Sequence, residues 1–118
     1  MQLDVWIEHE GYNGPVWEGG DWAFDTTKRE LAKSRSPFFP NGHDAFYLVT
    51  EYINSGKYEK DYIDQLTKYV MLPKFEILDM IDKLHCNLEH INARLDELKK
   101  YVENLPEQDF YKVVQQEF

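Results

Sequence analysis

The sequence has 118 residues, of which 42% are hydrophobic and 15% aromatic, and its formal net charge is −9. This length fits one domain with a modest core, and the composition is not typical of a disordered chain. The acidic charge argues against direct nucleic-acid binding, which needs clustered lysines and arginines. No apolar stretch approaches the ~20 residues of a membrane span.

The cysteine content and the first residues bear on the cellular compartment. Cys86 is the single cysteine, so no internal disulfide framework can form. The opening residues lack the basic segment and apolar core of a secretory signal. These features predict a cytoplasmic protein.

Residues 1–25 are predicted to form an acidic, aromatic β-ribbon. Residues alternate from Gln2 to His9, with Leu3, Val5 and Ile7 on one side, and this period of two is typical of a strand. Turn residues follow at 11–15, and a return strand is expected from Val16. The ribbon contains no Lys or Arg but six acidic residues: Asp4, Glu8, Glu10, Glu18, Asp21 and Asp25.

Residues 26–72 are predicted to form short helices. Thr27 and Glu30 have the spacing of a capping box, and a helix is expected to end before Pro37. Asp44 is expected to cap a second helix that stops at Gly56. A third helix is expected over 59–71, with its buried face formed by Tyr62, Ile63, Leu66 and Val70.

Residues 73–105 carry the most regular pattern in the chain. Nine apolar residues recur with alternating gaps of four and three, as in a heptad seam: Ile77, Ile81, Leu84, Leu88, Ile91, Leu95, Leu98, Val102 and Leu105. This spacing predicts one continuous helix over 74–104, about 46 Å long. Its apolar stripe fits an intramolecular bundle or a homodimeric coiled coil, and the flanking charges do not choose between the two.

The predicted fold is a single α+β domain over 1–118, mostly α, in which an N-terminal β-hairpin packs on a helical bundle. Residues 106–118 supply a short C-terminal helix, with Phe110, Val113 and Val114 on one face.

Two groups of residues have the chemical types of a catalytic or metal site. Asp82, Cys86 and His90 recur every four residues beside His85 and Glu89, but a structural zinc site takes four ligands and no second cysteine exists. Glu8 and Glu10 would share a strand face from which His9 points away. We therefore predict no catalytic residue, metal or cofactor and no enzymatic activity, and a hydrolase or metalloenzyme remains the third-ranked interpretation.

The acidic surface is instead predicted to bind a basic protein, such as a nucleic-acid-processing enzyme. Carboxylates seven residues apart on the outer face of the long helix could mimic spaced phosphates. The size and charge resemble, by analogy alone, inhibitor or immunity proteins of mobile elements. The alternative is a coiled-coil oligomerisation or scaffold subunit. The predicted partner-binding residues are Glu8, Glu10, Trp17, Glu18, Asp21, Trp22, Asp82, Glu89, Asp96 and Glu103.

Overall fold

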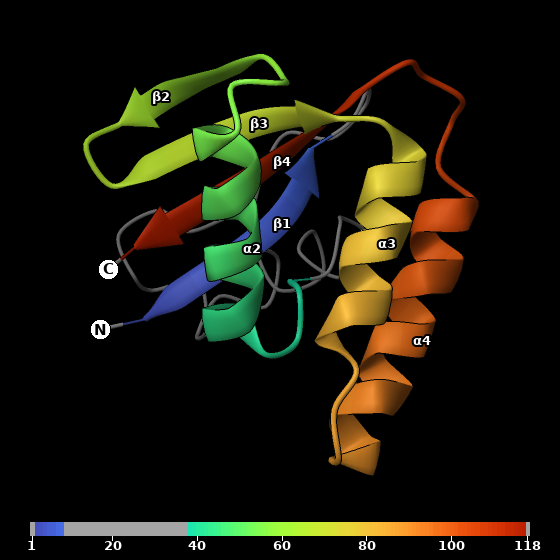
Figure 1. Cartoon of the computed structure of the whole chain (residues 1–118). Coiled ribbons are helices and arrows are strands. Elements are labelled where there is room, and N and C mark those ends of the chain that lie inside the picture. The colour runs from blue at the N-terminus through green and yellow to red at the C-terminus, as the bar shows by residue number, and fades with distance from the viewer. Residues whose placement is uncertain (1, 9–37, 118) are drawn as a thin grey trace, which may run out of the picture.

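An antiparallel sheet forms the framework of the computed structural model, which describes residues 2–8 and 38–117. Its four strands are β1 (Leu3–Glu8), β2 (Lys60–Asp64), β3 (Thr67–Leu72) and β4 (Tyr111–Glu117), in the spatial order β1-β4-β3-β2. Three helices complete the described part of the chain: α2 (Gly42–Asn54), α3 (Lys74–Leu84) and α4 (Glu89–Glu103). Figure 1 shows α2 across one face of the sheet and the antiparallel helices α3 and α4 side by side next to it.

The predicted fold class was wrong, because the described domain is built on this sheet and not on a helical bundle. The predicted N-terminal strand is confirmed as β1 over Leu3–Glu8, and it pairs with β4. The expected turn at 11–15, the return strand and the helix after Thr27 lie outside the described residues. The core lies between the sheet and the helices and includes Val5, Val113 and Ile77.

The predicted continuous helix over 74–104 was also wrong, since it is divided into α3 and α4 by residues 85–88. His85 leaves the helical conformation with φ −59° and ψ 139°. The side chain of Asn92 then accepts from the Cys86 N–H at 2.9 Å and donates to the Cys86 carbonyl at 2.8 Å, which holds the connection. No glycine or proline marks this break, and the gap of four residues from Leu84 to Leu88 keeps the heptad spacing intact across it.

The apolar stripe is covered within the chain, because α3 and α4 fold back on one another. Leu84, Leu95 and Leu98 are buried in the core, as are most other seam residues. Leu88, at the connection, is 52% exposed. The described structure therefore contains no coiled-coil seam that needs a second copy of the chain.

The segment 59–71, predicted as a helix, is the hairpin of β2 and β3. The Asp64 side chain accepts the Leu66 N–H at 2.8 Å, which stabilises the two-residue turn between the strands. Aromatic and β-branched residues such as Tyr69 and Val70 favour the strand conformation. Val70 is buried as predicted, but Leu66 is exposed.

The predicted C-terminal helix is the strand β4. Val113 and Val114 point to opposite faces of a central strand, and both are fully buried. A strand covered on both faces shows a run of apolar residues and no alternation, and such a run fits one face of a helix equally well.

The helix predicted from Asp44 to Gly56 is confirmed as α2, with Ala45, Val49 and Ile53 buried. It begins earlier than predicted, at Gly42, and Asp44 lies in its first turn. A Cβ atom at Gly42 would lie 2.3 Å from the carbonyl oxygen of Leu3, so the close approach of α2 to β1 requires glycine here.

Candidate functional site

Most of the N-terminal residues predicted to bind a partner lie outside the described residues. These are Glu10, Trp17, Glu18, Asp21 and Trp22. Glu8 is described and is half-buried. Its carboxylate accepts from Trp6 Nε1 at 3.3 Å and lies 4.0 Å from Lys112 Nζ, so it is engaged in contacts within the sheet.

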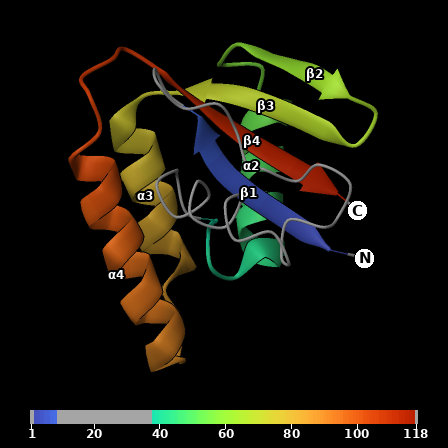
Figure 2. The same cartoon turned by 180° about the vertical axis from the view of Figure 1, so that it is seen from behind.

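Val5 and Ile7 belong to the core, so Glu8 points to the opposite face of β1, away from the described helices. That face of the sheet lies in front in Figure 2. The register aligns three rows of side chains there: Asp4–Gln116–Thr67, Trp6–Val114–Tyr69 and Glu8–Lys112–Met71. Lys112 Nζ lies 4.6 Å from the centre of the Tyr69 ring. Trp6 is only 3% exposed and packs edge-on against Phe38. This face is therefore tied together by its own side chains.

The predicted acidic row is divided between two helices. Asp82 is on α3, and its carboxylate lies 3.6 Å from Lys99 Nζ on α4. Asp96 lies 2.9 Å from His85. Glu89, Asp96 and Glu103 remain exposed at seven-residue intervals along α4. Two of the four predicted carboxylates are therefore paired with a positive charge within the molecule: Asp82 with Lys99, and Asp96 with His85 when His85 is protonated.

The metal-like group at 82–90 does not assemble. The break after α3 removes the common helical face that would have aligned Asp82, Cys86 and His90. Among residues 2–8 and 38–117, no three His, Cys, Asp or Glu side chains are placed to hold a metal ion. Cys86 is exposed, and its backbone is bonded to Asn92.

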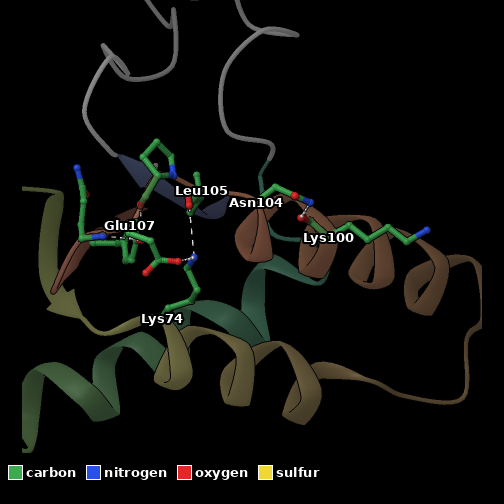
Figure 3. A network of polar contacts seen from close by, with 8 residues as sticks. Lys74, Lys100, Asn104, Leu105 and Glu107 are labelled. Atoms are coloured by element: carbon green, nitrogen blue, oxygen red, sulfur yellow. Dashed lines mark hydrogen bonds and ion pairs between the residues drawn. The ribbon is translucent and has the colours of Figure 1, made fainter.

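Lys74, the first residue of α3, belongs to a network of polar contacts (Figure 3). Lys74 Nζ donates to the Leu105 carbonyl at 3.3 Å and to Glu107 at 3.2 Å, and it lies 5.8 Å from the centre of the buried Tyr111 ring. Burial alone would lower the pKa of Lys74, but the hydrogen bond to Glu107 and the neighbouring Tyr111 raise it overall. The amine therefore stays charged at neutral pH and is a structural link, not a nucleophile.

The hairpin of β2 and β3 carries several exposed apolar side chains. All five residues of β2 are exposed. Tyr62 is 64% exposed, Ile63 51% and Leu66 54%, although large apolar side chains usually avoid such exposure. We define the hairpin surface as residues 60–66 together with Glu117, whose N–H donates to the Leu66 carbonyl.

A shallow hollow of about 410 Å³ lies at the turn of this hairpin. It is lined by Asp64, Gln65, Leu66, Gln116 and Glu117. Gln116 Nε2 donates to Thr67 at 3.0 Å, while its buried Oε1 has no hydrogen-bond partner in the described part of the chain. Asp64 and Glu117 thus place two carboxylates beside the exposed apolar residues of the hairpin surface.

The outer edge of β2, the last strand on its side of the described sheet, is poorly suited to pairing with another strand. Because Met71 N–H donates to the Glu59 carbonyl, the alternation of the ladder directs the backbone groups of Lys60 and Tyr62 outward. The Tyr62 N–H is already bonded to the Asp61 carboxylate at 2.7 Å, and a register shift follows Tyr62. Short, charged and irregular edges resist strand addition. A partner would therefore contact the hairpin surface through its side chains.

This surface was not predicted from the sequence, because a helix over 59–71 would have buried Tyr62, Ile63 and Leu66. The available signals were the concentration of aromatic and β-branched residues and the turn-forming Asp64.

Comparison with known proteins identifies no relative of this chain. No protein-family model, no curated protein and no solved structure matches the chain. Among the helices of the described residues, none has the length and apolar character needed to cross a membrane.

Proposed function

We propose that this protein is an acidic interaction module that binds a basic protein partner through the hairpin surface. The observation that carries the proposal is the exposure of Tyr62, Ile63 and Leu66 on one hairpin. Exposed aromatic and apolar side chains with a polar surround are typical of protein interaction sites.

The charge of the hairpin surface favours a basic partner. Asp61, Asp64 and Glu117 supply carboxylates. The two nearby lysines are engaged within the molecule, since Lys60 donates to the Ile53 carbonyl at 2.8 Å and Lys68 lies 5.0 Å from the centre of the Tyr62 ring. The net charge of −9 would also accelerate the encounter with a positively charged protein.

A nucleic-acid-processing enzyme is the partner class that we propose, because its binding surface must carry clustered Lys and Arg. Binding of the acidic module to that surface would inhibit the enzyme by competing with nucleic acid. In this proposal the module performs no chemistry itself and needs no cofactor.

The test uses a photo-crosslinking amino acid at position 62 of the full chain, with the same amino acid at Phe75 as a control. Both native residues are exposed aromatics, but Phe75 is on α3. A basic protein captured from position 62 and not from position 75 is then purified, and its Kd is measured for wild type and for Tyr62→Ala, Leu66→Ser and Phe75→Ala.

We expect Tyr62→Ala or Leu66→Ser to weaken binding about tenfold or more, as hot-spot residues do, while Phe75→Ala leaves the Kd unchanged. Neither hairpin variant should lower stability appreciably, because both side chains are exposed. Equal weakening by all three variants, or capture of the same proteins from both positions, would contradict the proposal.

A further inference from the structure

His85 occupies a position in which both ring nitrogens face hydrogen-bond acceptors. Nδ1 lies 3.0 Å from the carbonyl oxygen of Ile81 in the last turn of α3, and Nε2 lies 2.9 Å from Asp96 Oδ1 on α4. A carbonyl and a carboxylate only accept hydrogen bonds, whereas a neutral imidazole carries a single N–H. Both contacts can therefore form only when the ring is doubly protonated.

The charged groups around His85 come from both helices. Asp96 on α4 faces the ring directly, and the carboxylate of Asp82 on α3 is engaged by Lys99 at 3.6 Å. The neighbouring thiol of Cys86 belongs to an exposed residue whose backbone is held by Asn92. Asp96 is therefore the carboxylate that directly stabilises a positive charge on the ring.

We propose that His85 is a pH-sensitive clamp between α3 and α4. In the protonated form the ring joins the last turn of α3 to α4 through Ile81 and Asp96. In the neutral form it keeps one of these hydrogen bonds, and its other nitrogen turns a lone pair toward an acceptor oxygen. Deprotonation therefore loosens the connection formed by residues 85–88.

The pH range of the clamp follows from the groups around the ring. The hydrogen bond to Asp96 raises the pKa of His85, partial burial lowers it, and the hydrogen bond to the Ile81 carbonyl raises it further, so the net change is upward from 6.5. A raised pKa means that the clamp contributes its full stabilisation below pH 6.5 and loses it as the pH rises through the pKa of the folded protein.

Deprotonation also changes the charge on the outer face of α4. When His85 is neutral, the charge of Asp96 is no longer compensated, and it adds to those of the exposed Glu89 and Glu103. The outer face of α4 thus gains one net negative charge in the same pH range. This consequence holds whether or not the hairpin surface binds a partner.

The test is an NMR titration of the His85 ring in the full chain, together with amide hydrogen exchange at His85 and Cys86. We expect the pH midpoint of the His85 ring titration to be higher in wild type than in Asp96→Asn. After correction for the intrinsic effect of pH, exchange at the two amides should accelerate about 2- to 5-fold across that midpoint, as suits an exposed ion pair.

Two further variants make the result decisive. His85→Gln keeps a neutral donor and should abolish the pH-dependent change in amide exchange, whereas His90→Gln, a control on the exposed side of α4, should retain it. The clamp is overturned if Asp96→Asn leaves the His85 midpoint unchanged. It is equally overturned if exchange at residues 85 and 86 shows the same dependence on pH in His85→Gln as in wild type.

Discussion

The Nζ atom of Lys74 lies 3.3 Å from the carbonyl oxygen of Leu105, so the first residue of α3 is bonded to the chain just beyond α4. His85, just after the end of α3, and Asp96, in the middle of α4, connect the same two helices again. The apolar stripe of each helix is thereby kept against the other and against the sheet. This pairing within the chain replaces the partner helix that the heptad pattern requires.

Replacing Lys74 should loosen the junction between α4 and β4. Lys74→Met keeps the aliphatic stem but removes the hydrogen bonds to Leu105 and Glu107. We expect the free energy of unfolding in urea to fall by about 1–2 kcal/mol. Lys68→Met is the control, because the Lys68 ammonium lies over the exposed Tyr62 ring and makes no ion pair within the described residues. This variant should change stability by less than about 0.5 kcal/mol. Equal effects would contradict a structural role for Lys74.

The division of the long apolar pattern into two helices predicts unequal costs for equivalent leucines. Leu95→Ala should lower the free energy of unfolding by about 2–4 kcal/mol, since Leu95 is fully buried. Leu88→Ala should cost less than about 1 kcal/mol, because Leu88 is 52% exposed at the connection. A continuous, paired helix would instead bury both residues, so similar losses measured by chemical denaturation would support that alternative.

Gly42 should tolerate no side chain at the start of α2. In Gly42→Ala the new Cβ would meet the Leu3 carbonyl at 2.3 Å, and α2 would have to move away from β1. We expect a loss of about 1–3 kcal/mol in the free energy of unfolding. Gly56→Ala provides a comparison, because nothing lies within 4 Å of the Cβ that the alanine would add. The positive φ of this residue opposes the change, and we expect it to lower the free energy of unfolding by about 1 kcal/mol. A larger loss at Gly56 than at Gly42 would contradict this packing.

Asp4 should destabilise the folded protein at neutral pH. Its burial raises the pKa of the carboxyl above 3.8, although the hydrogen bond from Gln2 lowers it in part. The folded state therefore binds the proton more tightly than the unfolded state, and stability falls as the pH rises from below 3.8 through the raised pKa. Asp4→Asn should be more stable than wild type at pH 7, with the difference vanishing near pH 3. Urea denaturation at both pH values gives the comparison, and an equal difference at both would refute this ionisation effect.

Local patterns in the sequence predicted β1 and α2 because each segment shows the period of its own element. Leu3–Glu8 alternates, and Ala45, Val49 and Ile53 follow the helical period. The same reasoning failed for β4, which is buried on both faces, and for the break after Leu84, which keeps the heptad spacing. In these two places the tertiary packing decides the structure, and the local pattern fits more than one outcome.

The candidate sites depended on the break after Leu84 and on the conformation of residues 59–71, which was also predicted wrongly. A helix over 59–71 would make Tyr62 and Leu66 core residues, so this prediction hides the hairpin surface. The contact between His85 and Asp96 joins residues eleven apart, which can meet only if the chain reverses direction between them. An unbroken helix would have placed them about 16 Å apart.

The proposed function rests most directly on the conformation of residues 59–71, which backbone NMR can measure in the full chain. The account predicts strong Hα–Hα contacts from Lys60 to Val70 and from Tyr62 to Lys68, the two pairs that do not exchange backbone hydrogen bonds. Contacts between residues three apart along this segment would indicate a helix. A helix there would bury the apolar side chains of the hairpin surface, so that result would contradict the account.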